Sequence, residues 1–203
     1  MAGCGAEAVL ARMGCEVTPL AFATAVAWWD WLAVNHATQS EVWVLYHKKA
    51  SGVASIDWQQ AVVEALAWGW IDGVRKTQSE TQWIQRFTPR KAGSAWSEIN
   101  RAHAERLIAE GRMQAPGLAA VEVARANGRW AATYSGGKGA DLPQDFLEGL
   151  AVAPQAARET FAALDAKGRY AIYYRLTTAK RTETRAKRLA EFLARLAEGK
   201  PPV

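Results

Sequence analysis

The stretch WIDGVRKTQSETQWIQRF, residues 70–87, predicts the element around which the fold is organised. Its two ends, Trp70–Arg75 and Gln82–Phe87, carry the β-branched and aromatic residues that favour strands. The segment Lys76–Thr81 between them is polar, as expected of a connecting turn. Upstream, Val42–His47 is apolar on both faces and is predicted to be a central strand. The sequence therefore predicts a small antiparallel sheet built on a hairpin.

Helix start and stop signals flank these three runs. Small polar residues that cap helix N-termini are followed, about one helix length later, by residues that end helices. The four helices expected in this part of the chain run from Thr24 to about Asn35, from Asp57 through Leu66, from Ser94 to Gly111, and from Pro116 to Asn127 and Gly128.

Beyond the Gly/Ser stretch Tyr134–Ala140, the chain looks helical. Tyr170–Leu176 is ambiguous between strand and helix, as short aromatic runs are. The other expected helices are Asp141–Leu150, Pro154–Leu164 with Gly168 ending it, and about Thr182–Glu198, whose leucines recur at helical spacing.

These elements predict an α+β fold, predominantly α, in which helices pack a small antiparallel sheet and a helical module follows. We expect a loosely ordered leader over residues 1–18, a Trp-rich α+β domain over 19–132 and a linker over 133–140. Residues 141–203 would form the C-terminal module, which we expect to dock on the first domain.

The leader shows no targeting signal. It has no basic segment followed by a continuous apolar one, so we expect no secretory signal. Nowhere do about 18 apolar residues run together, so we expect no membrane span and a cytoplasmic location. Both cysteines, Cys4 and Cys15, lie in the leader, and we interpret them as two reduced thiols.

The charge of the chain is mildly basic and uneven. Half of the 203 residues are hydrophobic and 22% are charged, with a net charge of +5, which fits a folded globular protein. Residues 75–112 hold 8 basic and 4 acidic side chains, and residues 167–203 hold 10 and 3, whereas residues 1–74 hold 3 and 7. The basic blocks are either solvated helix faces or parts of one concavity that attracts anions.

Tryptophan is the unusual residue, with ten in the chain. A carboxylate and guanidiniums among indoles suit an anionic or flat ligand, because arginine binds oxyanions and stacks on aromatic rings. Alternatively, the indoles fill the core, and a half-buried Asp72 takes Arg75 or Arg86 as its partner. The dense region, Ala67–Asn100, holds Trp68, Trp70, Asp72, Arg75, Trp83, Arg86, Arg90, Trp96 and Asn100.

Four segments in this order resemble the YdeI/OmpD-associated bacterial family. They are Gly69–Gly73 (GWIDG), Gln85–Arg90 (QRFTPR), Trp96–Asn100 (WSEIN) and Ala179–Arg185 (AKRTETR). The resemblance extends from about Trp31 to Gly199.

This resemblance implies a cytoplasmic protein with a C-terminal helical module, and it favours helix for Tyr170–Leu176. It also implies a link to protection against bacteriocins or cationic peptides, but no particular reaction and no catalytic residues. A chain of net charge +5 repels cationic peptides unless the acidic block of residues 1–74 forms the contact face.

Three functional hypotheses follow, and whether the chain is an enzyme stays open. In the leading one it binds a small anionic or aromatic ligand, without a cofactor, in a pocket lined by Trp and Arg side chains. In the second it is an enzyme with Asp72 as general base. In the third, disfavoured for lack of any nucleic-acid-binding motif, it binds nucleic acid weakly.

Metal binding is not expected either, because the three histidines lack metal-ligand spacing. Protein partners stay open. The residues expected at the ligand site are Trp68, Trp70, Asp72, Arg75, Arg86, Arg90, Trp96 and Asn100, with Arg181 and Arg185 from the last helix.

Overall fold

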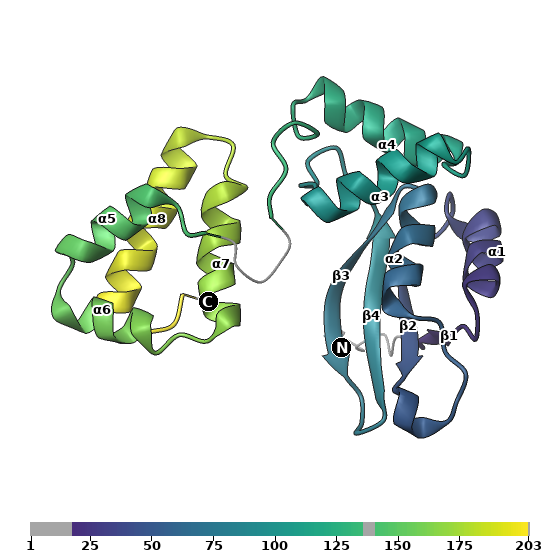
Figure 1. Cartoon of the computed structure of the whole chain (residues 1–203), viewed down its shortest axis with the longest axis horizontal. Helices are drawn as coiled ribbons and strands as arrows, with labels where there is room; N and C mark the ends of the chain where they lie inside the picture. Colours follow the sequence, from purple (N-terminus) through teal and green to yellow (C-terminus); the bar gives the residue numbers. More distant parts are fainter. Residues whose placement is uncertain (1–17, 136–140, 203) are drawn as a thin grey trace, which may run out of the picture. The chain divides into compact units, whose positions relative to one another are not determined.

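The computed structural model describes residues 18–135 and 141–202 (Figure 1). The expected leader with its two cysteines, and residues 136–140 of the expected linker, lie outside the described residues. Contacts divide the chain into two compact units. The first holds the described residues up to Ala65 together with Trp70–Pro89, and the second holds Leu66–Gly69 together with the residues from Arg90 on.

The first unit is built on a four-stranded sheet with the order β1-β2-β4-β3. The predicted hairpin is confirmed, with both strands two residues longer than expected. The strand over residues 42–47 is central, as predicted. The sheet is mixed rather than purely antiparallel, because an unpredicted two-residue strand pairs parallel to β2. The strands are β1 (Leu20–Ala21), β2 (Val42–His47), β3 (Trp70–Thr77) and β4 (Gln82–Pro89).

A β-bulge interrupts the pairing of β3 with β4. Asp72 lies opposite Phe87 and Arg75 lies opposite Gln85, so three steps along β3 match two along β4. One extra residue is thereby accommodated in β3. Asp72 and Arg75 consequently point to the same face of the sheet, although three steps along the chain, an odd number, lead from one to the other.

Aromatic contacts join this face to the helices α1 (Ala25–Asn35) and α2 (Trp58–Ala67). A short 3₁₀ turn, η1 (Lys49–Ser51), precedes α2. Trp28 is fully buried, and its indole N–H donates to the Ala61 carbonyl at 3.0 Å. Its ring lies 5.4 Å from that of Phe87 on β4. This contact joins the predicted first helix to the centre of the sheet.

Local capping explains where these helices begin. Thr24 accepts a hydrogen bond from the Ala27 N–H, as an N-cap threonine does. At α2 a capping box is present: Asp57 accepts from the Gln59 N–H at 2.8 Å, and Gln60 accepts from the Asp57 N–H at 3.4 Å.

After Arg90, the first two helices of the second unit are α3 (Glu98–Ala109) and α4 (Ala115–Ala126). The prediction that α3 starts at Ser94 is wrong. Ser97 is the N-cap and accepts from the Asn100 N–H at 3.1 Å, whereas Ser94 accepts from the Lys91 N–H in the preceding turn.

A close helix approach in this unit depends on a glycine. A Cβ at Gly117 in α4 would collide with the carbonyl of Ala67 and the sulfur of Met113. α4 therefore packs against the last turn of α2 through a residue without a side chain.

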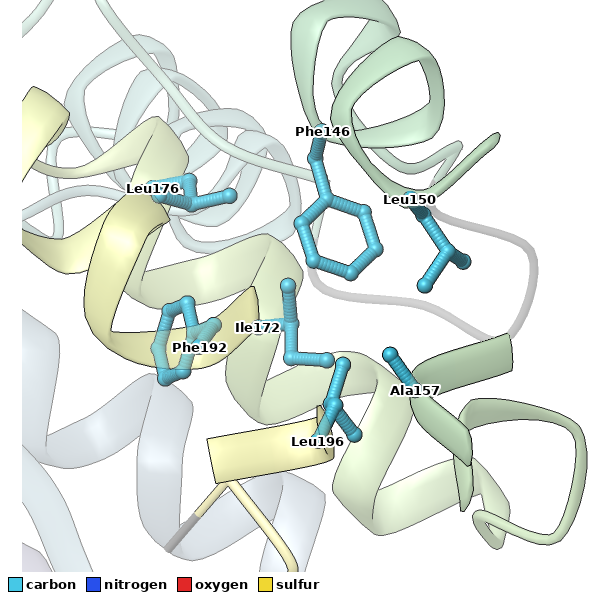
Figure 2. Packing of buried hydrophobic residues seen from close by; sticks show 7 residues of the cluster. All are labelled: Phe146, Leu150, Ala157, Ile172, Leu176, Phe192 and Leu196. Carbon is cyan, nitrogen blue, oxygen red and sulfur yellow. The ribbon is translucent and has the colours of Figure 1, made fainter. Parts of the chain in front are cut away.

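The remaining helices enclose a separate hydrophobic cluster (Figure 2). It consists of Phe146, Leu150, Ala157, Ile172, Leu176, Phe192 and Leu196, and we call residues 141–202 with this cluster the C-terminal module. Its helices are α5 (Gln144–Val152), α6 (Gln155–Ala162), α7 (Ala166–Thr177) and α8 (Thr182–Ala197).

Two expectations about this module have clear outcomes. Tyr170–Leu176 is helical, within α7. Gly168 does not end the preceding helix: it lies in the first turn of α7, where its N–H donates to the N-cap residue Asp165 at 2.7 Å. Glycine is tolerated in a first turn, and the aspartate three residues earlier sets the start.

The α+β fold with predominant helix is thus confirmed, while the division of the chain at residues 133–140 stays a prediction. Within the described ranges, no helix has the length and apolar character required to cross a membrane.

Candidate functional site

The sheet of the first unit separates the predicted site residues that it carries. Trp70, Asp72 and Arg75 share the face that includes Phe87. Arg86, next to Phe87 on β4, points to the opposite face and pairs with Trp43 of β2. Arg86 and Asp72 therefore lie on opposite faces of the sheet.

On the first face, three side chains from neighbouring strands form a continuous pile, which we call the Arg75 stack. The guanidinium carbon of Arg75 on β3 lies 4.0 Å from the ring centre of Trp83 on β4. The Trp83 ring lies 4.1 Å from that of Tyr46 on β2, with only 7° between the ring planes. The stack runs from an exposed cation through a half-buried indole to a buried phenol.

The charge of Arg75 has no counter-ion in the part of the chain that the structure describes. Asp72, the partner that sequence reasoning suggested, instead accepts a hydrogen bond from the Gln85 amide at 3.1 Å. The same amide donates to the Gly73 carbonyl at 2.7 Å, so Gln85 fixes the carboxylate to the bulge. Arg75 is left with a positive charge held against an aromatic face, a geometry that orients the guanidinium without neutralising it.

Tyr46 ends the stack on the buried side. The residue is 2% exposed, and its hydroxyl has no hydrogen-bond partner among the described residues. Burial, followed by the negative charges of Asp72 and Asp57, raises the pKa of Tyr46 well above its ordinary value. The phenol therefore stays neutral and available as a hydrogen-bond donor.

The opposite face carries a second cation over an indole, but there a carboxylate is present. The ammonium of Lys76 lies 4.7 Å from the ring centre of Trp43. Glu41 accepts from the Trp43 indole N–H at 3.2 Å and lies 3.7 Å from a guanidinium nitrogen of Arg86. The charge of Arg86 thus has a counter-ion.

Arg90, Trp96 and Asn100, predicted site residues of the second unit, make contacts within that unit. The Arg90 guanidinium lies 3.6 Å over the ring of buried Trp96, and Arg90 also donates to the carbonyls of Gly69 and Ala95. The backbone N–H of Asn100 supplies the α3 cap, and Trp68 is half-buried.

The two arginines of α8 differ from each other. Arg181 is the exposed N-cap residue of the helix. Arg185 binds both carboxylate oxygens of Asp145 on α5, with one contact at 2.8 Å. The hydrogen bond to Arg185 holds the pKa of Asp145 below its ordinary value and raises the pKa of the Arg185 guanidinium. The Arg185 side chain therefore connects α8 to α5 through its ion pair with Asp145.

The enzyme hypothesis depends on Asp72, and a metal site would need a group of acidic, His or Cys side chains. Asp72 lies half-buried on the same face as Tyr46, held by Gln85. Between residues 18 and 135 and between 141 and 202, no three His, Cys, Asp or Glu side chains are grouped so that they could hold a metal ion.

Two family models match different parts of the chain. Residues 140–199 match the model of a family described as "Bacteriocin-protection, YdeI or OmpD-Associated". The resemblance expected from the sequence is thus confirmed for the C-terminal region. Residues 20–120 match a different model, a domain of unknown function (DUF8412).

Three of the four segments on which the resemblance was based, those between Gly69 and Asn100, lie in the region that this second model matches. No curated protein and no solved structure matches the chain. The family matches name no ligand and no reaction.

Proposed function

We propose that the protein binds a small anionic ligand at the Arg75 stack. The observation that carries the proposal is the exposed guanidinium of Arg75, held over Trp83 with no carboxylate partner among the described residues. The contact with the indole holds the guanidinium carbon 4.0 Å from the ring centre, and the guanidinium keeps its N–H groups as donors. Such an arrangement suits a carboxylate or phosphate oxygen approaching from solvent.

Arg86, Arg185 and Arg90 are weaker candidates for the same role. Arg86 lies beside Glu41, Arg185 is bound by Asp145, and the Arg90 guanidinium donates to the Ala95 carbonyl. An incoming anion would have to displace or share these contacts. No residue of the described ranges makes such a contact with the Arg75 guanidinium.

Protection against antimicrobial peptides belongs to this proposal only as a biological setting. Its support is the family description of the C-terminal region. The net charge of +5 opposes direct capture of cationic peptides, so we propose that any such role is exerted through a bound small anion, in the cytoplasm.

A pair of neighbouring substitutions tests the site. Arg75→Gln removes the unpaired cation, and Lys76→Gln removes the same charge one residue away, on the opposite face of the sheet. Probes are benzoate, indole-3-acetate, inorganic phosphate and adenosine monophosphate, measured by calorimetry and by thermal unfolding. A probe at 100 times its dissociation constant adds about 2.7 kcal/mol, which raises the midpoint by roughly 5–10 °C at this size.

The expected result is that at least one probe binds the wild type and Lys76→Gln alike. Arg75→Gln should weaken that probe by about 10- to 100-fold, since a hydrogen bond to a charged group contributes about 1.5–3 kcal/mol. Equal losses in both variants would mean that diffuse charge, not the stack, attracts the anion. Unchanged binding in Arg75→Gln would refute the site.

A further inference from the structure

We infer that the Tyr46 hydroxyl is the inner recognition group of this site and donates a hydrogen bond to a neutral oxygen of the bound ligand. The inference rests on the proposed function and adds the chemical class of the ligand. Its starting point is a buried donor that no described residue satisfies.

Within residues 18–135 and 141–202, no hydrogen bond uses this hydroxyl. Tyr46 packs through its ring, which lies flat against Trp83 within the Arg75 stack. A phenylalanine would fill the same place, and it would avoid the free-energy cost of burying a polar group without a partner. A tyrosine at this position therefore needs a function for its oxygen.

The position of Tyr46 in the sheet indicates how a ligand reaches it. β3 is an edge strand, β4 lies next to it, and β2 is further in. The stack therefore leads from the exposed cation of Arg75, past the half-buried Trp83, to the phenol. A ligand held at the edge by Arg75 would extend its other end inward, toward Tyr46.

Charges around the two ends of the stack differ in sign. Asp72 and Asp57 act on the hydroxyl of Tyr46, which disfavours a second negative charge there. At the edge, Arg75 favours a negative charge. The ligand should therefore have an anionic group at one end and a neutral hydroxyl or carbonyl oxygen at the other. A small aromatic hydroxy acid has this pattern.

The test compares two probes that differ by one hydroxyl, benzoate and 4-hydroxybenzoate, on the full-length protein. Calorimetry should show that the wild type binds 4-hydroxybenzoate about three- to tenfold more tightly, the value of one net hydrogen bond. In Tyr46→Phe this preference should disappear while benzoate affinity stays the same. Tyr174→Phe, which alters an exposed tyrosine of the second unit, is the matched control and should keep the preference.

Thermal unfolding without any probe supplies an independent readout. The midpoint of Tyr46→Phe should equal or exceed that of the wild type, because no hydrogen bond within the protein is lost. A lower midpoint would show that the hydroxyl satisfies a structural partner, such as an internal water, and would overturn the inference.

The two proposals fail in different ways. Binding of benzoate that depends on Arg75, with no preference for the hydroxylated probe or a preference that survives Tyr46→Phe, overturns only the role of Tyr46. Binding of both probes that does not depend on Arg75 overturns the site and the inference together. Absence of binding by both probes overturns the aromatic-acid inference alone, and phosphate and nucleotide then test the stack.

Discussion

The sheet of the first unit and the C-terminal module use their cations in different ways. On the sheet, Arg75 and Lys76 lie over the rings of Trp83 and Trp43, from opposite faces. In the module, arginine side chains donate to the carbonyls at helix ends, where the backbone lacks intrahelical partners. These pairs are Arg158 with Ala151 and Ala153, Arg169 with Ala162 and Leu164, and Arg188 with Arg175.

A local excess of basic residues therefore does not indicate where a cation without a counter-ion lies. Residues 167–203 hold 10 basic and 3 acidic side chains, the strongest basic excess of the chain. In this block Arg169 and Arg188 donate to carbonyls at helix ends, and Arg185 binds Asp145. The less basic block contains Arg75, whose charge no described residue neutralises.

The largest expected effect tests whether the core or the arginines hold the module together. Phe146→Ala removes a fully buried ring from the cluster in Figure 2. It should lower the free energy of unfolding by about 3–5 kcal/mol, through lost burial and the cavity left behind. Chemical denaturation followed by circular dichroism measures this. Val152→Ala on the same helix, 88% exposed, should change the value by less than about 0.5 kcal/mol.

An intermediate effect concerns the Arg185–Asp145 pair. Their side chains are 32% and 43% exposed, so Arg185→Gln should cost only about 1 kcal/mol at neutral pH. Because the pKa of Asp145 is lowered in the folded state, its contribution is present above the ordinary aspartate pKa near 4 and is lost as pH falls through the lower, folded value.

Denaturation at pH 7 and at pH 3 or below tests the sign of this effect. The difference in unfolding free energy between wild type and Arg185→Gln should shrink on acidification. A difference that grows, or stays constant down to pH 2, contradicts the assignment of the pair.

The smallest effect distinguishes capping cations from solvated ones within the module. Arg169 donates to two carbonyls and lies 5.1 Å from the ring centre of Phe161, so Arg169→Gln should cost about 0.5–1 kcal/mol. Lys187 is 78% exposed beside Glu191, and Lys187→Gln should cost less than about 0.5 kcal/mol. Thermal unfolding of both variants in one buffer gives the comparison, and equal costs would remove the distinction.

Much of the fold was predictable because its signals are local. Thr24 and Asp57 mark helix starts as capping residues, and the β-branched and aromatic residues of the hairpin mark its strands. Local rules also explain the errors. From residue type alone, Ser94 and Ser97 are equally good N-caps. In the structure the Ser94 hydroxyl accepts a hydrogen bond within the preceding turn, and Ser97 caps the helix.

The candidate site was less predictable because its members meet through pairing between distant strands. Trp83 was noticed only as part of a dense region, and Tyr46 was missed, since its place beside Trp83 depends on the register of β2 with β4. The register of β3 with β4, which sets Asp72 opposite Phe87, turns Arg86 away from Asp72. A long-range pairing of this kind leaves no mark on a single sequence.

The bulge in β3 also governs how this hairpin can vary in length. Three residues along β3 cover the distance of two along β4 between Asp72 and Arg75. A chain with one residue fewer at Gly73 or Val74 would therefore pair regularly and still present Arg75 on the face of Trp83. A one-residue gain or loss elsewhere in the strand would exchange the two faces. In related sequences, a single gap at this point is compatible with the same arrangement of side chains.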